Sequence, residues 1–365
     1  MQSRKPSDFF LPIPKLTTKS RRCCRFCRTF IASVWLVASF LGCGSPQPTS
    51  DSPQRVVLQL NWYPEPEHGG AFAAVAAGYY QQAGIDVEIR QGGAATPLAA
   101  DLESGRCQFA FANADDVAMY RNRGVKAVAL HAALQDHPRC ILVRKESGVE
   151  SLEQLGGLTL QRQPGMPFVE FMRIRGLLEK VKEVPYTGTV AGLVTDPSVA
   201  IQAYCYAEPL QATQQGIEVN ALMVSTLGWN PYSSVLITTE RLIQEQPELV
   251  RQFVQATSKG WLEYIARPEP ANELIFAANR HGMTREVLEF GVQQLPRLMM
   301  PAGMTEEQIG QMSLERWQEL IDHLVELDLI DPKNVRAEDC FDVRFLMNQP
   351  TIANEAAAKD VAATD

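Results

Sequence analysis

Short apolar runs alternate with longer amphipathic or alanine-rich segments from residue 56 onward. Residues 56–60 are apolar and predict a buried strand. Residues 68–83 are alanine-rich and predict a helix that ends at Gly84, and residues 85–89 alternate like a strand. Two more helix–glycine–strand units follow, with helices at 97–104 and 115–123 and strands at 107–111, 125–130 and 140–144. This order predicts βαβ crossovers and a parallel sheet.

A second α/β unit begins at residue 151, where Ser151 and Gln154 have the spacing of a capping box. The pattern that follows predicts strands at 158–161, 203–206 and 221–224, and helices at 168–181 and 208–215. Residues 233–238 predict a strand that returns to the first unit. Beyond residue 240 the pattern is almost entirely helical, with a last helix through residue 327 that starts at a capping box of Thr305 and Gln308.

The element order predicts an α/β protein of two lobes with parallel-type sheets, the second lobe being inserted into the first. The expected divisions are residues 55–147 for the first part of lobe 1, 148–232 for lobe 2, 233–345 for the return strand and C-terminal helices of lobe 1, and 346–365 for a disordered tail. Ligands of such sheets bind beyond the carboxyl ends of the strands. We therefore expect a ligand cleft between the lobes, where hinge closure would bury a small molecule.

The composition is that of a globular chain of one large or two ordinary domains. Of 365 residues, 45% are hydrophobic and 21% are charged, with a net charge of −8. No run of 18 apolar residues occurs, which excludes a multi-span membrane protein. The acidic balance argues against nucleic acid as a partner, because phosphate binding requires clustered basic residues.

The net charge conceals a basic leader. Residues 1–42 hold eight basic side chains and one acidic side chain, and the apolar run 30–42 follows Arg28 directly. This pattern is typical of a signal peptide, while an uncleaved membrane anchor is the alternative. Cys43 follows Gly42 as in a bacterial lipobox, so we expect a lipid on Cys43, a flexible tether over residues 43–54, and an extracytoplasmic, lipid-anchored protein.

The cysteines beyond the leader fit no metal pattern. They are far apart and lack histidine partners at ligand spacing: Cys107, Cys140, Cys205 and Cys340. Cys107 and Cys140 open predicted strands, as buried thiols do. We therefore expect no metal and no cofactor.

Aromatic and polar residues follow the predicted strands. Trp62 and Tyr63 lie just past the first strand, where an aromatic side chain either stacks on a flat heterocycle or packs in the core. His68 stands at a predicted helix start, where it either caps the helix or donates to a ligand. Gln163, with Gly165 and Met166, follows the strand at 158–161 and is expected to line the opposite wall.

Acidic residues occur at two more strand ends. Asn113, Asp115 and Asp116 follow the strand at 107–111, and one of them is expected to be an N-cap. Glu208 follows the strand at 203–206 and could pair with amino and ring N–H groups, or simply favour the helix dipole. Three residues of the crossover at 229–232 are further candidates for ligand contact or hinge packing: Trp229, Asn230 and Tyr232.

Several stretches together resemble a known family. Residues 60–70 read LNWYPEPEHGG, residues 77–80 read AGYY, and Tyr206–Pro209 read YAEP. The chain is similar over about residues 55–265 to the periplasmic binding proteins of pyrimidine (thiamine-precursor) ABC transporters, and to the related eukaryotic hydroxymethylpyrimidine phosphate synthases. Parts of the pattern are shared with sulfonate and nitrate binders.

The resemblance implies the type II periplasmic-binding fold and ligand capture without chemistry. It adds Asn61 of the LNW block to the expected ligand contacts, and it implies a ligand-pairing role for Glu208. The synthases carry a cysteine cluster in the crossover, where residues 228–234 here contain no cysteine. They also carry a histidine and a lysine in the segment where this chain has Ala112, Asp115 and Asp116, so we do not expect an enzyme.

The resulting hypothesis is a monomeric solute-binding protein for a small planar amine, first of all a thiamine-precursor pyrimidine, with an ABC permease and its ATPase as partners. A sulfonate or nitrate binder is the alternative within the class. It would need N–H donors at helix starts and few acidic cleft residues, whereas the candidate positions here are acidic. A pyrimidine phosphate synthase and a structural lipoprotein with a closed cleft are the alternatives outside it.

Overall fold

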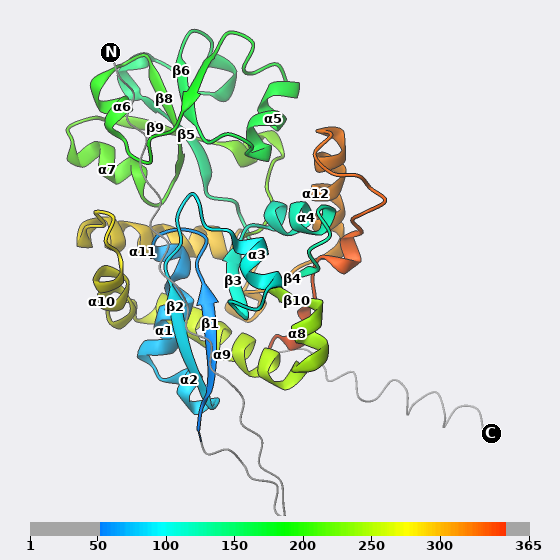
Figure 1. Ribbon diagram of the computed structural model, residues 1–365. Helices are drawn as coiled ribbons and strands as arrows, with labels where there is room; N and C mark the ends of the chain where they lie inside the picture. Colours follow the sequence, from blue (N-terminus) through cyan, green and yellow to red (C-terminus); the bar gives the residue numbers. More distant parts are fainter. Residues whose placement is uncertain (1–51, 348–365) are drawn as a thin grey trace, which may run out of the picture. The chain divides into compact units, whose positions relative to one another are not determined.

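The two predicted units are two separate five-stranded sheets (Figure 1). The computed structural model describes residues 52–347. The first sheet has the order β2-β1-β3-β10-β4, formed by Ile85–Arg90, Gln54–Gln59, Phe109–Ala112, Ser233–Thr239 and Ala127–Leu134. Strand β1 is parallel to β2 and β3, as expected, but β10 is antiparallel to both β3 and β4. The sheet is therefore mixed, because the returning strand β10 runs against its neighbours.

The second sheet has the order β7-β6-β8-β5-β9. Its strands are Lys182–Pro185, Thr159–Arg162, Val199–Tyr204, Arg139–Arg144 and Val219–Met223. Strand β5 pairs antiparallel with β8 and β9, so the strand expected at 140–144 in the first lobe belongs to the second sheet. The chain thus leaves the first sheet after β4, earlier than the division expected at residue 147.

The helix expected over residues 68–83 is divided in two. Helix α1 covers Gly69–Ala76 and α2 covers Tyr79–Gln82, and Gly78 between them has a positive φ of 72°, which interrupts the helical hydrogen-bond ladder. Helix α1 packs on α9 (Pro247–Ala266) at a very close crossing. A Cβ atom on Gly260 of α9 would lie 2.0 Å from the Gly70 carbonyl oxygen, so only a glycine fits there.

Several helices follow strands, so that their first residues lie beyond the carboxyl ends of those strands. Helix α4 (Ala114–Asn122) is capped by Asn113, which confirms the expected N-cap. Helix α5 (Pro167–Ile174) is shorter than expected and is followed by Gly176 with a φ of 75°. The other short helices are α3 (Leu98–Glu103), α6 (Ala191–Thr195) and α7 (Glu208–Gln214).

The C-terminal part is helical, as the sequence pattern predicts. Its helices are α8 (Glu240–Glu245), α9, α10 (Glu269–Ala278), α11 (Arg285–Met299) and α12 (Leu314–Glu326). The expected helix from residue 305 to residue 327 is instead a short 3-10 turn, Glu306–Gln308, followed by α12, which Ser313 caps.

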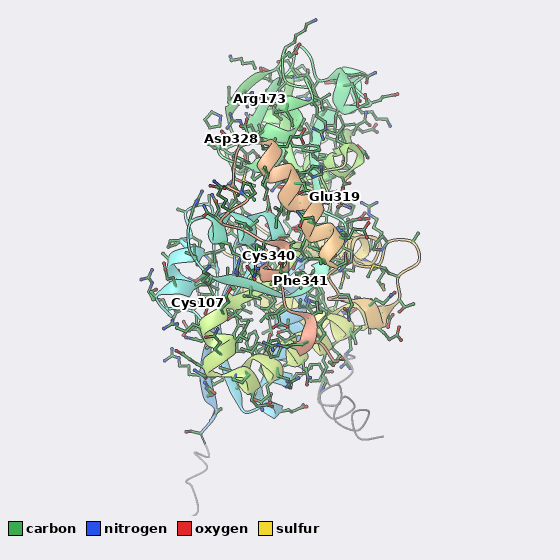
Figure 2. All side chains as sticks on the ribbon, turned by 90° about the vertical axis from the view of Figure 1, so that its right-hand side faces the viewer. Cys107, Arg173, Glu319, Asp328, Cys340 and Phe341 are labelled. Carbon is green, nitrogen blue, oxygen red and sulfur yellow. The ribbon has the colours of Figure 1, made fainter. Side chains whose placement is uncertain are left out.

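Helix α12 contacts residues of both α/β units. Figure 2 shows this helix as an orange ribbon that runs past the label of Glu319, with Asp328 labelled near its C-terminal end. His323 of α12 packs edge-on against Phe171 of α5 in the second unit, with ring centroids 5.0 Å apart, and Trp317 stacks on Phe341, 5.9 Å away. An ion pair of Arg175 with Glu326 adds a polar contact at the same helix.

The expected leader, Cys43 and residues 348–365 of the tail lie outside the described residues. Within residues 52–347, no helix combines the length and apolar character that crossing a membrane requires. The four cysteines of this region, Cys107, Cys140, Cys205 and Cys340, are buried free thiols.

Candidate ligand-binding site

A cavity of about 560 Å³ lies where the strand ends of the two sheets face each other. From the first sheet it is lined by Asn61 and Trp62 after β1 and by Asn113 after β3. From the second sheet it is lined by Gln163 after β6 and Glu208 after β8. The cavity thus occupies the carboxyl ends of parallel strands, as the sheet topology predicts.

A hydrogen-bonded chain fixes the polar groups behind the first wall. His68 Nδ1 accepts from the backbone N–H of Glu65 at 3.2 Å, so Nε2 carries the proton and donates to Asn61 Oδ1 at 2.9 Å. The Asn61 amide in turn reaches Glu67 Oε1 at 3.5 Å, and the hydroxyl of Tyr206 donates to Glu67 Oε2 at 2.7 Å. Burial lowers the pKa of His68 to about 3, so the nearby His68–Glu67 contact is a polar contact of a neutral ring.

Carboxyl groups crowd the cavity. Burial raises the pKa of Glu67 to about 7, and it raises that of Glu65 well above its usual range, with repulsion from Glu67 and Glu208 adding to the effect. Burial also raises the pKa values of Asp116 and Glu208. These groups favour a ligand that donates hydrogen bonds or carries positive charge, because such a ligand relieves both the desolvation and the mutual repulsion.

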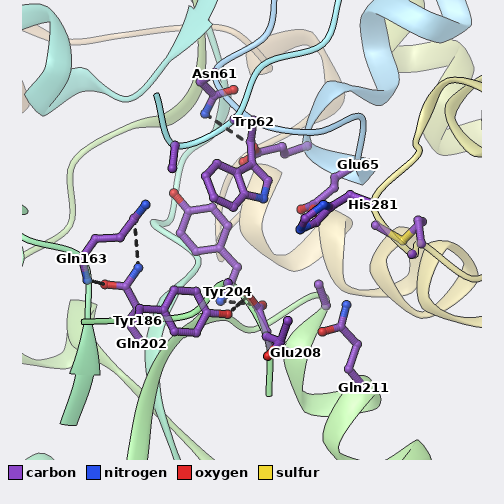
Figure 3. A pocket seen from close by; sticks show the side chains of 18 of the residues that line it. Asn61, Trp62, Glu65, Gln163, Tyr186, Gln202, Tyr204, Glu208, Gln211 and His281 are labelled. Carbon is purple, nitrogen blue, oxygen red and sulfur yellow. Dashed lines mark hydrogen bonds between the residues drawn. The ribbon is translucent and has the colours of Figure 1, made fainter. Parts of the chain in front are cut away.

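Glu208 and Asn113 are oriented by neighbouring tyrosines of the second sheet. Glu208 Oε2 accepts from the backbone N–H of Tyr204 at 2.9 Å, and Tyr186 donates its hydroxyl to Oε1 at 3.4 Å. The Asn113 amide donates to the Tyr204 hydroxyl at 3.3 Å, which joins the first wall to the second. Figure 3 shows Tyr186, Tyr204 and Glu208 together at the second wall, with Trp62 beside them.

Gln163 is fixed by a reciprocal pair of contacts. Its backbone N–H donates to Gln202 Oε1 at 2.7 Å, and the Gln202 amide donates to Gln163 Oε1 at 3.0 Å. Both side chains line the cavity. This part of the second wall is therefore neutral and rigid.

One cation, Arg139, shares the cavity with these carboxyl groups. It is the first residue of β5, and its guanidinium carbon lies 4.2 Å from the ring centre of Tyr204 and 5.0 Å from that of Phe168. Sequence analysis missed this residue. The strand RCILVR has an arginine at each end of an apolar run, and the first of them, Arg139, reaches the cavity.

A third wall comes from the segment between α10 and α11. Asn279, His281, Met283 and Thr284 line the cavity, and Val287 of α11 continues the same wall. The Asn279 amide donates to the Pro64 carbonyl at 2.8 Å, which attaches this segment to the loop after β1. Sequence analysis missed the whole wall, because these residues belong to a loop between two helices and follow no strand.

Seven residues that the sequence singled out line the cavity, namely Asn61, Trp62, Asn113, Asp116, Gln163, Met166 and Glu208. Three others lie directly behind it. Tyr63 contacts Trp62 edge-on and stacks on His281, His68 supports Asn61, and Asp115 is buried next to Asp116 with no described partner for its Oδ1 atom. Ligand contact of each residue stays a prediction.

The crossover residues are elsewhere: Trp229, Asn230 and Tyr232 are not among the residues that line the cavity. Trp229 packs against Phe171, and Asn230 accepts from the backbone N–H of His137 at 2.7 Å. Tyr232 accepts from the backbone N–H of Ser313 at 3.0 Å. The structure thus places all three in the packing at the junction with α12, the hinge-packing alternative of the sequence analysis.

Comparison with known sequences identifies the family. The sequence model of a family described as NMT1/THI5 like matches residues 65–271, more than half of the chain. The cavity residues Asn61 and Trp62 and the whole α10–α11 wall lie outside this matched region.

Three curated relatives cover most of the chain. The riboflavin-binding protein RibY of Chloroflexus aurantiacus is 24% identical, over 80% of this chain and 85% of its own. The formylaminopyrimidine-binding protein of Halalkalibacterium halodurans is 22% identical, over 85% and 97%. A 4-amino-5-hydroxymethyl-2-methylpyrimidine phosphate synthase of Legionella pneumophila is 20% identical, over 81% and 93%.

Solved structures share the fold. A ligand-binding component of an ABC-type import system from Staphylococcus aureus has a TM-score of 0.62 at 12% identity, covering 82% of this chain and 99% of its own. The aliphatic sulphonate binding protein SsuA of Escherichia coli has a TM-score of 0.59 at 15% identity, over 82% and 94%. The chain therefore has the periplasmic binding-protein fold and belongs to the NMT1/THI5-like family.

Proposed function

We propose that this chain captures a small planar heterocycle with amino groups, first of all a thiamine-precursor pyrimidine, and delivers it to an ABC permease and its ATPase. One observation carries the proposal: four carboxyl groups line the same cavity as the indole of Trp62. Carboxylates accept from amino and ring N–H groups, and an indole face stacks on a flat ring. The relative that binds formylaminopyrimidine supports this ligand class.

A flavin is the second candidate, and the size of the cavity favours it. The volume of about 560 Å³ lies within the range of about 300–1,000 Å³ that is usual for drug-sized ligands. A single pyrimidine ring would leave much of that space to water. The relative named for riboflavin binding supports a larger ring system.

An oxyanion ligand agrees less well with the same site. A sulfonate or nitrate would meet Glu65, Glu67, Asp116 and Glu208, and the similarity to sulfonate binders concerns the fold alone. Carboxyl groups that are ionised would repel an anion strongly in this poorly hydrated cavity, and protonated ones would lose the N–H donors that an amine supplies. We therefore rank anion binding below binding of an amine.

We infer capture without catalysis. The chain has Ala112, Asp115 and Asp116 where the synthases carry their histidine and lysine, and residues 228–234 contain no cysteine. Formation of a pyrimidine phosphate by the purified protein, supplied with pyridoxal phosphate and iron, would contradict this assignment.

We also propose that the protein works outside the cytoplasm, anchored through a lipid on Cys43. The basic leader, its apolar run and the Gly42–Cys43 pair support this. Mass spectrometry of protein extracted from membranes should show a diacylglycerol-modified Cys43, and the Cys43→Ser variant should lack this modification. An unmodified Cys43 in membrane-bound protein would favour an uncleaved anchor.

Thermal unfolding and calorimetry test the ligand class. An aminopyrimidine or riboflavin that binds the folded state should raise the free energy of unfolding by about 2.7 kcal/mol at a concentration of 100 Kd. Sulfonates and nitrate should produce no shift. Stabilisation by anions alone would overturn the proposal, and native mass spectrometry of freshly purified protein would identify a retained ligand directly.

A further inference from the structure

Arg139 is a buried cation for which no described residue supplies an acceptor. It lines the cavity although only 7% of its surface is exposed. Its Nε atom is buried with no hydrogen-bond partner, and among residues 52–347 no carboxylate lies within ion-pair distance of its guanidinium. Glu67, Asp116 and Glu208 sense its charge only from farther away.

The guanidinium is nevertheless held in place. It lies over the rings of Tyr204 and Phe168, and Arg139 pairs directly with Tyr204 across the β5–β8 ladder. The backbone N–H of Arg139 donates to His137 Nδ1 at 3.0 Å, which fixes the start of the strand. The aromatic contacts stabilise the positive charge and orient the plane of the guanidinium group. They accept no hydrogen bond from the N–H groups that lie in that plane.

A buried guanidinium without acceptors is unfavourable unless something else supplies them. A guanidinium group binds oxygen acceptors especially well, because two of its N–H groups are parallel and donate in the same direction. The carboxyl groups of the cavity, unlike Arg139, accept hydrogen bonds, so they favour a ligand that carries N–H donors. Arg139 and the carboxyl groups together are therefore complementary to a ligand that has an oxygen acceptor on one edge and N–H donors on another.

We propose that Arg139 determines specificity by binding an exocyclic carbonyl oxygen of the ligand, so that the site selects heterocycles with both an amino donor and a carbonyl acceptor. This inference rests on the proposed function and narrows its ligand class. It predicts that a plain aminopyrimidine binds less tightly than one that carries a carbonyl group.

Two matched ligand pairs test the inference by calorimetry. The first pair is cytosine and 4-aminopyrimidine. The second is 4-amino-5-formamidomethyl-2-methylpyrimidine and 4-amino-2,5-dimethylpyrimidine. In the wild-type protein the carbonyl-bearing member of at least one pair should bind about 10- to 100-fold more tightly, as expected for a hydrogen bond to a charged group. In Arg139→Met the ratio should fall to about 1, and Arg139→Lys should keep part of it.

Arg316→Met is the matched control. Arg316 also lies over an aromatic ring, that of Tyr232 at 3.9 Å, but its Nη2 atom donates to the carbonyls of Gln135 and Asn230 outside the cavity. The ratio of affinities within each ligand pair should be the same for Arg316→Met as for the wild-type protein. Cooperative thermal unfolding of each variant establishes that it is folded, and Arg139→Lys serves as the test if Arg139→Met does not fold.

The outcomes distinguish a wrong role for Arg139 from a wrong ligand class. A wild-type protein that binds all four compounds but prefers neither member of a pair contradicts the role of Arg139, as does a ratio that survives in Arg139→Met. A wild-type protein that binds none of the four and no riboflavin contradicts the proposed function itself.

Discussion

The imidazole of His281 lies flat against the phenol ring of Tyr63, with ring centroids 3.9 Å apart and an interplanar angle of 8°. The two residues come from distant parts of the chain, the loop after β1 and the α10–α11 segment. Tyr63 also meets Trp62 edge-on, so from behind the cavity it connects two rings, those of Trp62 and His281, that line it. In Figure 3, His281 and Trp62 lie on neighbouring sides of the cavity.

His281→Ala should loosen this side of the cavity. We expect ligand dissociation to become about threefold to tenfold faster, with a stability loss of about 0.5–1.5 kcal/mol, which is typical of an aromatic pair. Stopped-flow tryptophan fluorescence measures the rate. His323→Ala is the control, because His323 packs against Phe171 outside the cavity. Equal dissociation rates in both variants would contradict a role of His281 in ligand retention.

Trp62→Ala should weaken binding by about tenfold or more, whereas Trp62→Phe should keep most of the affinity, because a smaller aromatic face remains for stacking. Calorimetry with the best-binding heterocycle checks this. The Trp229→Phe variant changes an indole that packs on Phe171 away from the cavity, and it should leave the affinity unchanged. If Trp62→Ala binds like the wild-type protein, the stacking role is wrong.

Glu67 should make stability depend on pH. The unfolded chain releases this proton near the ordinary pKa of 4.5, while burial raises the folded pKa to about 7. The group therefore stabilises the folded state below pH 4.5, and this contribution is lost as the pH rises through about 7. Its partners are the Tyr206 hydroxyl, the Asn61 amide and neutral His68, with Arg139, Glu65 and Glu208 as the nearby charged or titratable groups.

Glu67→Gln removes that titration, so its stability relative to the wild-type protein should increase by about 3 kcal/mol between acidic and weakly alkaline pH. Urea unfolding at a series of pH values measures the difference. Thr226→Ala changes an exposed hydroxyl group that donates to the Met223 carbonyl and does not titrate in this pH range, so its difference from the wild-type protein should stay constant. A stability difference that does not change with pH would show that folding leaves the pKa of Glu67 unchanged.

Gly260→Ala should destabilise the protein, although alanine is the better helix former by about 1 kcal/mol. The added Cβ would lie 2.0 Å from the Gly70 carbonyl oxygen and 2.8 Å from Ala74 Cβ. We expect a loss of about 1–3 kcal/mol from overpacking, with unchanged ligand preference. Thermal unfolding measures it, and a gain in stability would show that α1 and α9 separate at little cost.

The sequence pattern predicted those parts of the site that follow strands. Apolar runs mark β1 and β3, and an aromatic residue shortly after the first, Trp62, and a polar residue directly after the second, Asn113, reach the cavity. The pattern could not reveal the sheet in which a strand pairs. The strand at 140–144 looks alike in either lobe, and only its ladders with β8 and β9 decide the question.

Two other differences have physical causes of the same kind. Trp229 and Tyr232 were candidates because exposing aromatic side chains is costly, but packing at the junction with α12 removes that cost equally well. Arg139 and the α10–α11 wall were missed because their position depends on contacts between distant segments. Local periodicity carries no information about such contacts.

The insertion of the second sheet has a genetic consequence. All five of its strands lie in one uninterrupted stretch, residues 139–223, whereas the first sheet is assembled from both sides of that stretch. A single recombination cassette would therefore exchange Arg139, Gln163, Tyr204 and Glu208 together, and leave Trp62 and Asn113 as they are. Exchange of this one segment would replace the second-sheet wall of the cavity in a single event and leave the first-sheet wall and the α10–α11 wall unchanged.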